Sequence, residues 1–176
     1  MRIASRYCWI VNRVGHTYGA MMFAPLPAAM LLDASPLHSM LGALACISAA
    51  NLPDRLEFGK IPHRTLTHTL SIWLSIAVYG YMLALSLVVI PFEPLKATST
   101  ILGAIICGFG CGGVSHWLGD VPNKQPVSTF TPWDGFALYL FKSGEHQRFT
   151  IALIGLEAWF LILFLRSELI RTVQMF

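Results

Sequence analysis

Histidine, aspartate and arginine residues recur in this chain at spacings that suit metal binding. In the segment 115–120, Ser-His-Trp-Leu-Gly-Asp, His116 and Asp120 are four residues apart, which places them on one face of a helix where they can share a cation. The run 63–68 reads His-Arg-Thr-Leu-Thr-His, and Arg64 within it suits a bidentate hold on phosphate or carboxylate. Imidazole combined with carboxylate oxygen is the ligand mix of zinc, manganese or iron sites.

Further ligand candidates lie at the ends of apolar segments. Asp54 comes at the end of the second apolar segment, His16 comes just before the first, and His68 begins the third, with His63 five residues before it. Four segments therefore bring nitrogen and carboxylate donors to one level of the membrane, whereas incidental polar residues would be scattered over both of its faces. The candidate metal ligands are His16, Asp54, His68, His116 and Asp120.

Taken one at a time, these residues have simpler interpretations. A lone His-x-x-x-Asp more often forms a cap or a hydrogen-bonded pair, and His63 or His68 alone would serve as a cap or a headgroup anchor. His38 lies near the opposite ends of the segments and is interpreted as a helix-end histidine. His146, beside Glu145, suits solvent or substrate as well as it suits a metal.

The composition predicts a membrane protein. Of the 176 residues, 55% are apolar or aromatic and 12% are charged, whereas a soluble domain usually carries about 25% charged residues. This excludes a disordered chain and a coiled coil, and it argues against an ordinary soluble domain. The net charge of +3 is too small to indicate nucleic-acid binding by itself. The four cysteines form no C-x-x-C pair and are interpreted as buried thiols.

Five apolar segments are the candidate membrane helices. A membrane helix needs roughly 20 residues, which the first two segments do not reach, so they are either tilted helices or a re-entrant hairpin. The third is the longest and is expected to span the membrane. Glu157, inside the fifth segment, is expected to face the bundle or a partner, and no catalytic role is predicted for it. The segments cover about 18–32, 38–52, 66–92, 98–118 and 149–165.

We therefore predict an all-α, polytopic membrane helical bundle of about four or five membrane helices. It forms a single membrane-embedded domain, 1–176, in which 119–148 is a capping loop. The side that holds the N-terminus and this loop carries nine Lys and Arg residues against three on the other, and the positive-inside rule places it in the cytoplasm. Gly108 and Gly112 have small-xxx-small spacing, which predicts close helix packing.

The order of these motifs resembles a known family. An early His16, a Pro-Asp at Asp54, His-Arg-x-x-x-His at 63–68 and Ser-His-x-x-x-Asp at 115–120 are similar to the YdjM-like, LexA-regulated, membrane-bound predicted metal-dependent hydrolases. The resemblance extends from His16 to about Gln147. It implies a multi-pass protein of a bacterial inner membrane, with the N-terminus and the metal site on the cytoplasmic side.

A more distant similarity in ligand order relates the chain to zinc-dependent phospholipase C and single-strand nucleases. By this similarity one metal ion is held by Asp54, His68, His116 and Asp120. His16 then holds a second ion, with Asp120 as the bridge, and His63 and Arg64 face the substrate.

Two departures from these patterns limit the implied metal content. The family often has a second acidic residue two positions after the Pro-Asp, and here that position is Leu56, with Glu57 adjacent. The further histidine-rich ligand set of the phospholipase has no clear counterpart in this chain. The resemblance therefore implies one or two divalent ions, with zinc favoured over manganese or iron.

The activity implied is metal-assisted hydrolysis of a phosphoester, in a lipid headgroup, a nucleotide or a nucleic acid. Asp54 or Asp120 would orient the attacking water, and Arg64 would stabilise charge in the transition state; the implied catalytic set is Asp54, His63, Arg64 and Asp120. Membrane lipids are the expected partners. Two other classes stay open: a non-catalytic metal-binding or structural membrane protein and, less favoured, a transporter or a haem protein.

Overall fold

The described residues form an all-α structure. A computed structural model describes residues 8–58, 60, 64–88, 93–140, 142 and 146–174. In these residues the regular elements are all helices, and the one β-type pairing is an isolated bridge between Val127 and Phe136. The predicted all-α class is confirmed.

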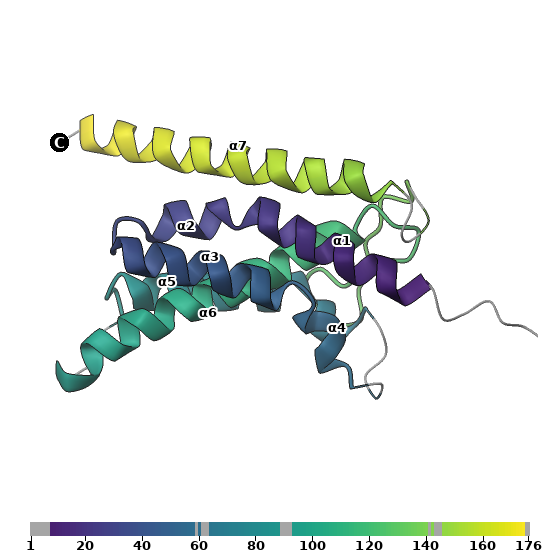
Figure 1. The fold of residues 1–176 in the computed structure, drawn as a ribbon, viewed down its shortest axis with the longest axis horizontal. Helices are drawn as coiled ribbons and strands as arrows, with labels where there is room; N and C mark the ends of the chain where they lie inside the picture. The colour runs from purple at the N-terminus through teal and green to yellow at the C-terminus, as the bar shows by residue number, and fades with distance from the viewer. Residues whose placement is uncertain are drawn as a thin grey trace, which may run out of the picture.

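The helices run back and forth along one long axis (Figure 1). The first two follow one another in nearly the same direction, and the third returns beside them. The C-terminal helix lies along the outside of the bundle. The elements are α1 (Cys8–Phe23), α2 (Pro25–Leu31), α3 (Pro36–Ala49), α4 (Leu52–Leu56), the 3₁₀ turn η1 (Leu66–His68), α5 (Leu70–Ala84), α6 (Glu93–Asp120) and α7 (Gln147–Gln174).

The prolines of the first apolar segment do not end its helical course. Pro25 and Pro27 lie in the first turn of α2, where a missing N–H costs little. The N–H of Ala24 donates to Ala20 and that of Ala28 donates to Ala24, at 2.8 and 3.2 Å. At its other end, α1 begins at Cys8, well before residue 18, where the first apolar segment is predicted to start. The expectation that His16 precedes the first helix is therefore wrong.

The third segment is shorter than predicted. The stretch 66–92 was expected to be the longest helix, but α5 has 15 residues and ends at Ala84, whereas α6 and α7 have 28 each. Ser86 adopts a left-handed backbone, with φ of 56°. The N–H of Ser86 donates to Leu83, and that of Leu87 donates to Met82. These bonds form a Schellman-type cap, which ends the helix although the left-handed residue is a serine.

Two of the described helices are long and apolar enough to cross a membrane. They cover Lys96–Asp120 and Gln147–Leu165, whereas α3 and α5 are shorter apolar helices. A helical membrane protein is therefore consistent with the structure, and the number of crossings stays a prediction.

Glycines bring α6 into backbone contact with both of its main neighbours. A Cβ on Gly108 would meet the carbonyl of Gly42 in α3, and one on Gly112 would meet the carbonyl of Cys46. On another face, a Cβ on Gly103 would meet the backbone of α5. The close packing predicted from the small-xxx-small spacing is confirmed, and α6 is the central helix of the bundle.

Candidate metal centre

One end of the bundle gathers the histidines and aspartates that the sequence singles out. The side chains of His68 and His116 are almost fully buried, and Asp120 is 3% exposed. Their nitrogen and oxygen atoms fall into groups that lie within 4.8 Å of one another. α1, α4, η1 and the last turn of α6 supply the cluster, which consists of His16, Asp54, His68, His116 and Asp120.

Two histidine nitrogens and two carboxylate oxygens of this cluster lie at separations that suit a small cation. The Nε2 atoms of His68 and His116 are 3.1 Å apart. Asp54 Oδ1 lies 3.2 Å from the first nitrogen and 3.6 Å from the second, and Asp120 Oδ2 lies 3.8 and 3.6 Å from them. Zinc bonds of about 2.0–2.1 Å in a tetrahedron place ligand atoms about 3.3 Å apart. The observed separations match this edge length to within about half an ångström.

The outer nitrogens of the two histidines are held by acceptors. His116 Nδ1 lies 2.7 Å from the carbonyl oxygen of Ala50, which can only accept, so this nitrogen carries the hydrogen. His68 Nδ1 lies 3.2 Å from Glu57 Oε1 and 3.1 Å from the hydroxyl of Thr67. Such partners fix the tautomer of metal-binding histidines and turn the Nε2 lone pair towards the ion. The lone pairs of the two Nε2 atoms and the two carboxylate oxygens therefore face one another, and a cation between them would compensate the negative charge of the carboxylates.

Asp54 is the most exposed of the four converging groups, with 16% of its side chain accessible. Burial raises the pKa of this carboxyl, but its interactions with His68, at 3.2 Å, and with the imidazoles of His116 and His16 outweigh burial and lower the pKa. The net effect is a pKa below the usual value, so Asp54 is ionised at neutral pH. It is a ready metal ligand on the open side of the centre.

The two oxygens of Asp120 have different partners. Oδ1 accepts from Arg64 Nη2 at 2.8 Å and from Asn123 Nδ2 at 3.1 Å, whereas Oδ2 points to the two histidines. The other guanidinium nitrogen, Nη1, donates to the carbonyl of Gln125 at 2.6 Å. Arg64 is 7% exposed. The structure thus places it against a ligand carboxylate, where it orients Asp120, while its predicted role at a substrate stays a prediction.

His16 lies beside the four converging atoms. Its ring stacks on that of His116, with centroids 3.8 Å apart and planes inclined by 19°. His16 Nε2 is 3.8 Å from Asp120 Oδ1, the oxygen that already accepts two hydrogen bonds. A side chain at Gly119 would press on His16 Nδ1, 2.8 Å from the position of a Cβ. With Asp54 and His116, His16 forms a further group able to hold a metal ion, so whether the centre holds one ion or two stays a prediction.

Glu57 belongs to this centre, although no role was predicted for it. Besides His68 Nδ1, it lies 3.3 Å from the N–H of Arg64 and 3.5 Å from the hydroxyl of Thr67. With Asp54 and His68 it forms another group able to hold a metal ion. The signal in the sequence is its spacing, three residues after Asp54, which puts both carboxylates on one face of a helical turn.

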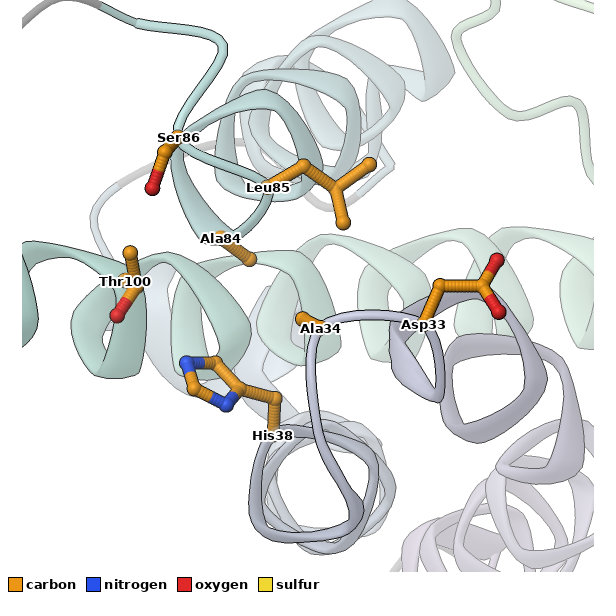
Figure 2. A pocket seen from close by; sticks show the side chains of 7 residues that line it. All are labelled: Asp33, Ala34, His38, Ala84, Leu85, Ser86 and Thr100. Carbon is orange, nitrogen blue, oxygen red and sulfur yellow. The ribbon is translucent and has the colours of Figure 1, made fainter.

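His38 lies in the first turn of α3, at the end of the bundle away from the metal centre (Figure 1). It lines a cavity of about 290 Å³ together with Asp33 and Thr100 (Figure 2). Ser35 caps α3 by accepting the N–H of His38 at 3.2 Å, and its hydroxyl is 2.6 Å from His38 Nδ1. This position in the first turn of α3 agrees with the interpretation as a helix-end histidine.

The other candidates lie outside this cluster or outside the described residues. His63 falls outside the described residues. His146 is exposed in the turn before α7 and belongs to none of the metal-binding groups found in the described chain. Glu157 on α7 borders an apolar cavity of about 580 Å³ between α7, α6 and α5.

Comparison with known proteins finds one family. The family model described as YdjM inner membrane protein matches residues 10–174. Neither the curated proteins nor the solved structures contain a match to this chain.

Proposed function

The chain belongs to the YdjM inner membrane protein family, and on that premise we propose that it is a membrane-bound, metal-dependent hydrolase. One divalent ion, with zinc favoured over manganese or iron, is held by Asp54, His68, His116 and Asp120. The observation that carries the proposal is the approach of two histidine Nε2 atoms to 3.1 Å between two carboxylates. Such an arrangement suits a cation and is costly without one.

Some residues would bind the ion, and others hold the ligand side chains in position. Glu57 and the carbonyl of Ala50 fix the two imidazole rings, and Arg64 fixes Asp120. A bound zinc ion would supply an acidified water for hydrolysis at neutral pH. Asp54 stands on the open side of the centre, where it would orient that water. His16 lies beside Asp54 and His116, in a group that could also hold an ion.

The proposed substrate is a phosphoester in a lipid headgroup, a nucleotide or a nucleic acid. The centre lies at the end of α6, close to the start of α7, and these are the two helices able to cross a membrane. This supports a position of the centre at the level of the lipid headgroups. The excess of Lys and Arg on the same side supports a cytoplasmic orientation.

The experiment is elemental analysis of the detergent-purified protein together with a phosphodiesterase assay. His116→Ala and Asp120→Ala should each lose the metal and the activity, because each removes a ligand from the converging four. His38→Ala is the matched control and should retain both. A parent protein that takes up no metal after purification without chelators and subsequent addition of zinc would overturn the proposal.

A purely structural metal site is the second candidate. Two imidazoles and two carboxylates would give an ion four protein ligands, and closed four-ligand sites are typical of structural zinc. The near-complete burial of His68 and His116 favours this reading. Metal retained at one equivalent without hydrolysis of any phosphoester, together with a fall in thermal stability on chelation, would support it over the hydrolase.

A further inference from the structure

The loop that joins α6 to α7 folds back along the start of α5. The N–H of Leu70 donates to the carbonyl of Ser128 at 3.2 Å, and the N–H of Ser71 donates to Thr129 at 2.9 Å. The hydroxyl of Ser71 donates to the carbonyl of Phe130 at 2.9 Å. These bonds satisfy N–H groups that the first turn of a helix leaves without partners. The loop therefore lies level with the first turn of an apolar helix.

A single carboxylate fixes the turn that follows, residues 129–134, which we call the Asp134 turn. The carboxylate of Asp134 accepts the N–H of Thr129 at 2.6 Å, of Phe130 at 2.8 Å and of Thr131 at 2.9 Å. These hydrogen bonds from Thr129 and Thr131 lower the pKa of Asp134 below its usual value. Val127 and Phe136 exchange two backbone hydrogen bonds at the base. The turn is thus a fixed scaffold.

Two aromatic side chains project from this scaffold. Trp133 is 90% exposed and Phe130 is 79% exposed. Fixing such side chains on a rigid turn prevents them from folding back to cover themselves. The neighbouring helix α5 also carries exposed apolar side chains, such as the half-exposed Leu74. Lys124, exposed on the same loop, adds a cation suited to lipid phosphates. Tryptophan beside apolar helices is typical of the membrane–water interface.

We propose that the Asp134 turn is a membrane anchor, which inserts Phe130 and Trp133 into the interfacial layer of the leaflet nearest the metal centre. The same loop is tied to that centre. Ser128 donates its hydroxyl to the carbonyl of Arg64 at 3.0 Å, and Gln125 accepts from its guanidinium. Anchoring the turn therefore fixes the depth of Asp120 relative to the lipid headgroups. This inference does not depend on hydrolysis.

The test measures which solvent surrounds the indole of Trp133. The full chain is placed in lipid nanodiscs whose phospholipids carry bromine near the glycerol end of the acyl chains, because bromine quenches tryptophan on contact. The emission of Trp133 is obtained by subtracting that of Trp133→Phe from that of the parent. The matched control is Trp159→Phe, since Trp159 is 57% exposed on α7 within a candidate membrane helix.

We expect most of the Trp133 emission to be lost in brominated lipid and to be protected from iodide in the buffer, as for Trp159. Trp133 emission that iodide quenches, and that brominated lipid leaves unchanged, would overturn the anchor. In that case the aromatic turn faces water and is a surface for a protein partner instead. Metal content should be unchanged in Trp133→Phe, so loss of the centre cannot be mistaken for loss of the anchor.

Discussion

Gly112→Ala should weaken metal binding although residue 112 contacts none of the ligands. A Cβ at this position would lie 2.5 Å from the carbonyl oxygen of Cys46 and 2.7 Å from the Cβ of Ala49. Neither neighbour can rotate away, because one is backbone and the other is a methyl fixed to it. Ordinary contact begins near 3.4 Å, so α3 and α6 must separate by about 0.7–0.9 Å.

This separation acts directly on a ligand. Ala50, at the end of α3, accepts the hydrogen bond that orients His116, at 2.7 Å, and a shift of this size lengthens it to about 3.5 Å, where a hydrogen bond is lost. Loss of such an orienting partner costs about 10–100-fold in metal affinity. The overpacking itself should cost about 1–3 kcal/mol of stability.

The assay is competition for zinc between the detergent-purified protein and a chromophoric chelator. Gly155→Ala is the matched control, since its Cβ would meet only the terminal methyl of Met22, at 2.7 Å, which can swing aside. Zinc affinity in Gly112→Ala that equals the affinity in Gly155→Ala would refute the reasoning, because it would show that backbone contact between α3 and α6 does not set the position of His116.

Three further outcomes are expected. Glu57→Gln should lower zinc affinity by about tenfold in the same titration, because the acceptor at His68 Nδ1 loses its charge; an unchanged affinity would remove Glu57 from the centre. Because the folded-state pKa of Asp54 lies below 3.8, its stabilising effect is complete above about pH 5 and declines as the pH falls below 4. The difference in melting temperature between the metal-free parent and Asp54→Asn should therefore shrink in acid, and a difference independent of pH would contradict this. Asp134→Asn should speed amide hydrogen exchange at Thr129 to Thr131, and exchange as slow as in the parent would show that other contacts fix the turn.

Helical periodicity and the order of the apolar segments were together enough to predict that the residues of the cluster lie near one another. His116 and Asp120 share a face because they are four residues apart, and topology alone brings the ends of the other segments to the same level. The sequence could not predict which oxygen of Asp120 faces the histidines. Arg64, which determines this by its hydrogen bond to the other oxygen, is 56 positions away in sequence. The Ala50 carbonyl is 66 positions away from His116, and its role could not be predicted either, since any residue supplies a carbonyl.

Helix ends were harder to predict than helix faces. The end of α5 depends on Ser86 in a left-handed conformation, and a serine gives no sign of this in the sequence, whereas a glycine would. The start of α1 lies among polar residues such as Asn12 and Arg13, which read as a loop in sequence.

The peripheral position of α7 bears on the order in which the protein is made. All four converging atoms come from residues that precede α7 in the chain, and the loop that holds Arg64 also precedes it. A chain still emerging from the ribosome therefore possesses every part of the centre before its last helix is synthesised. Under the proposed function, metal binding does not have to wait for release of the finished polypeptide, and α7 is added along the outside of a bundle that already holds these residues.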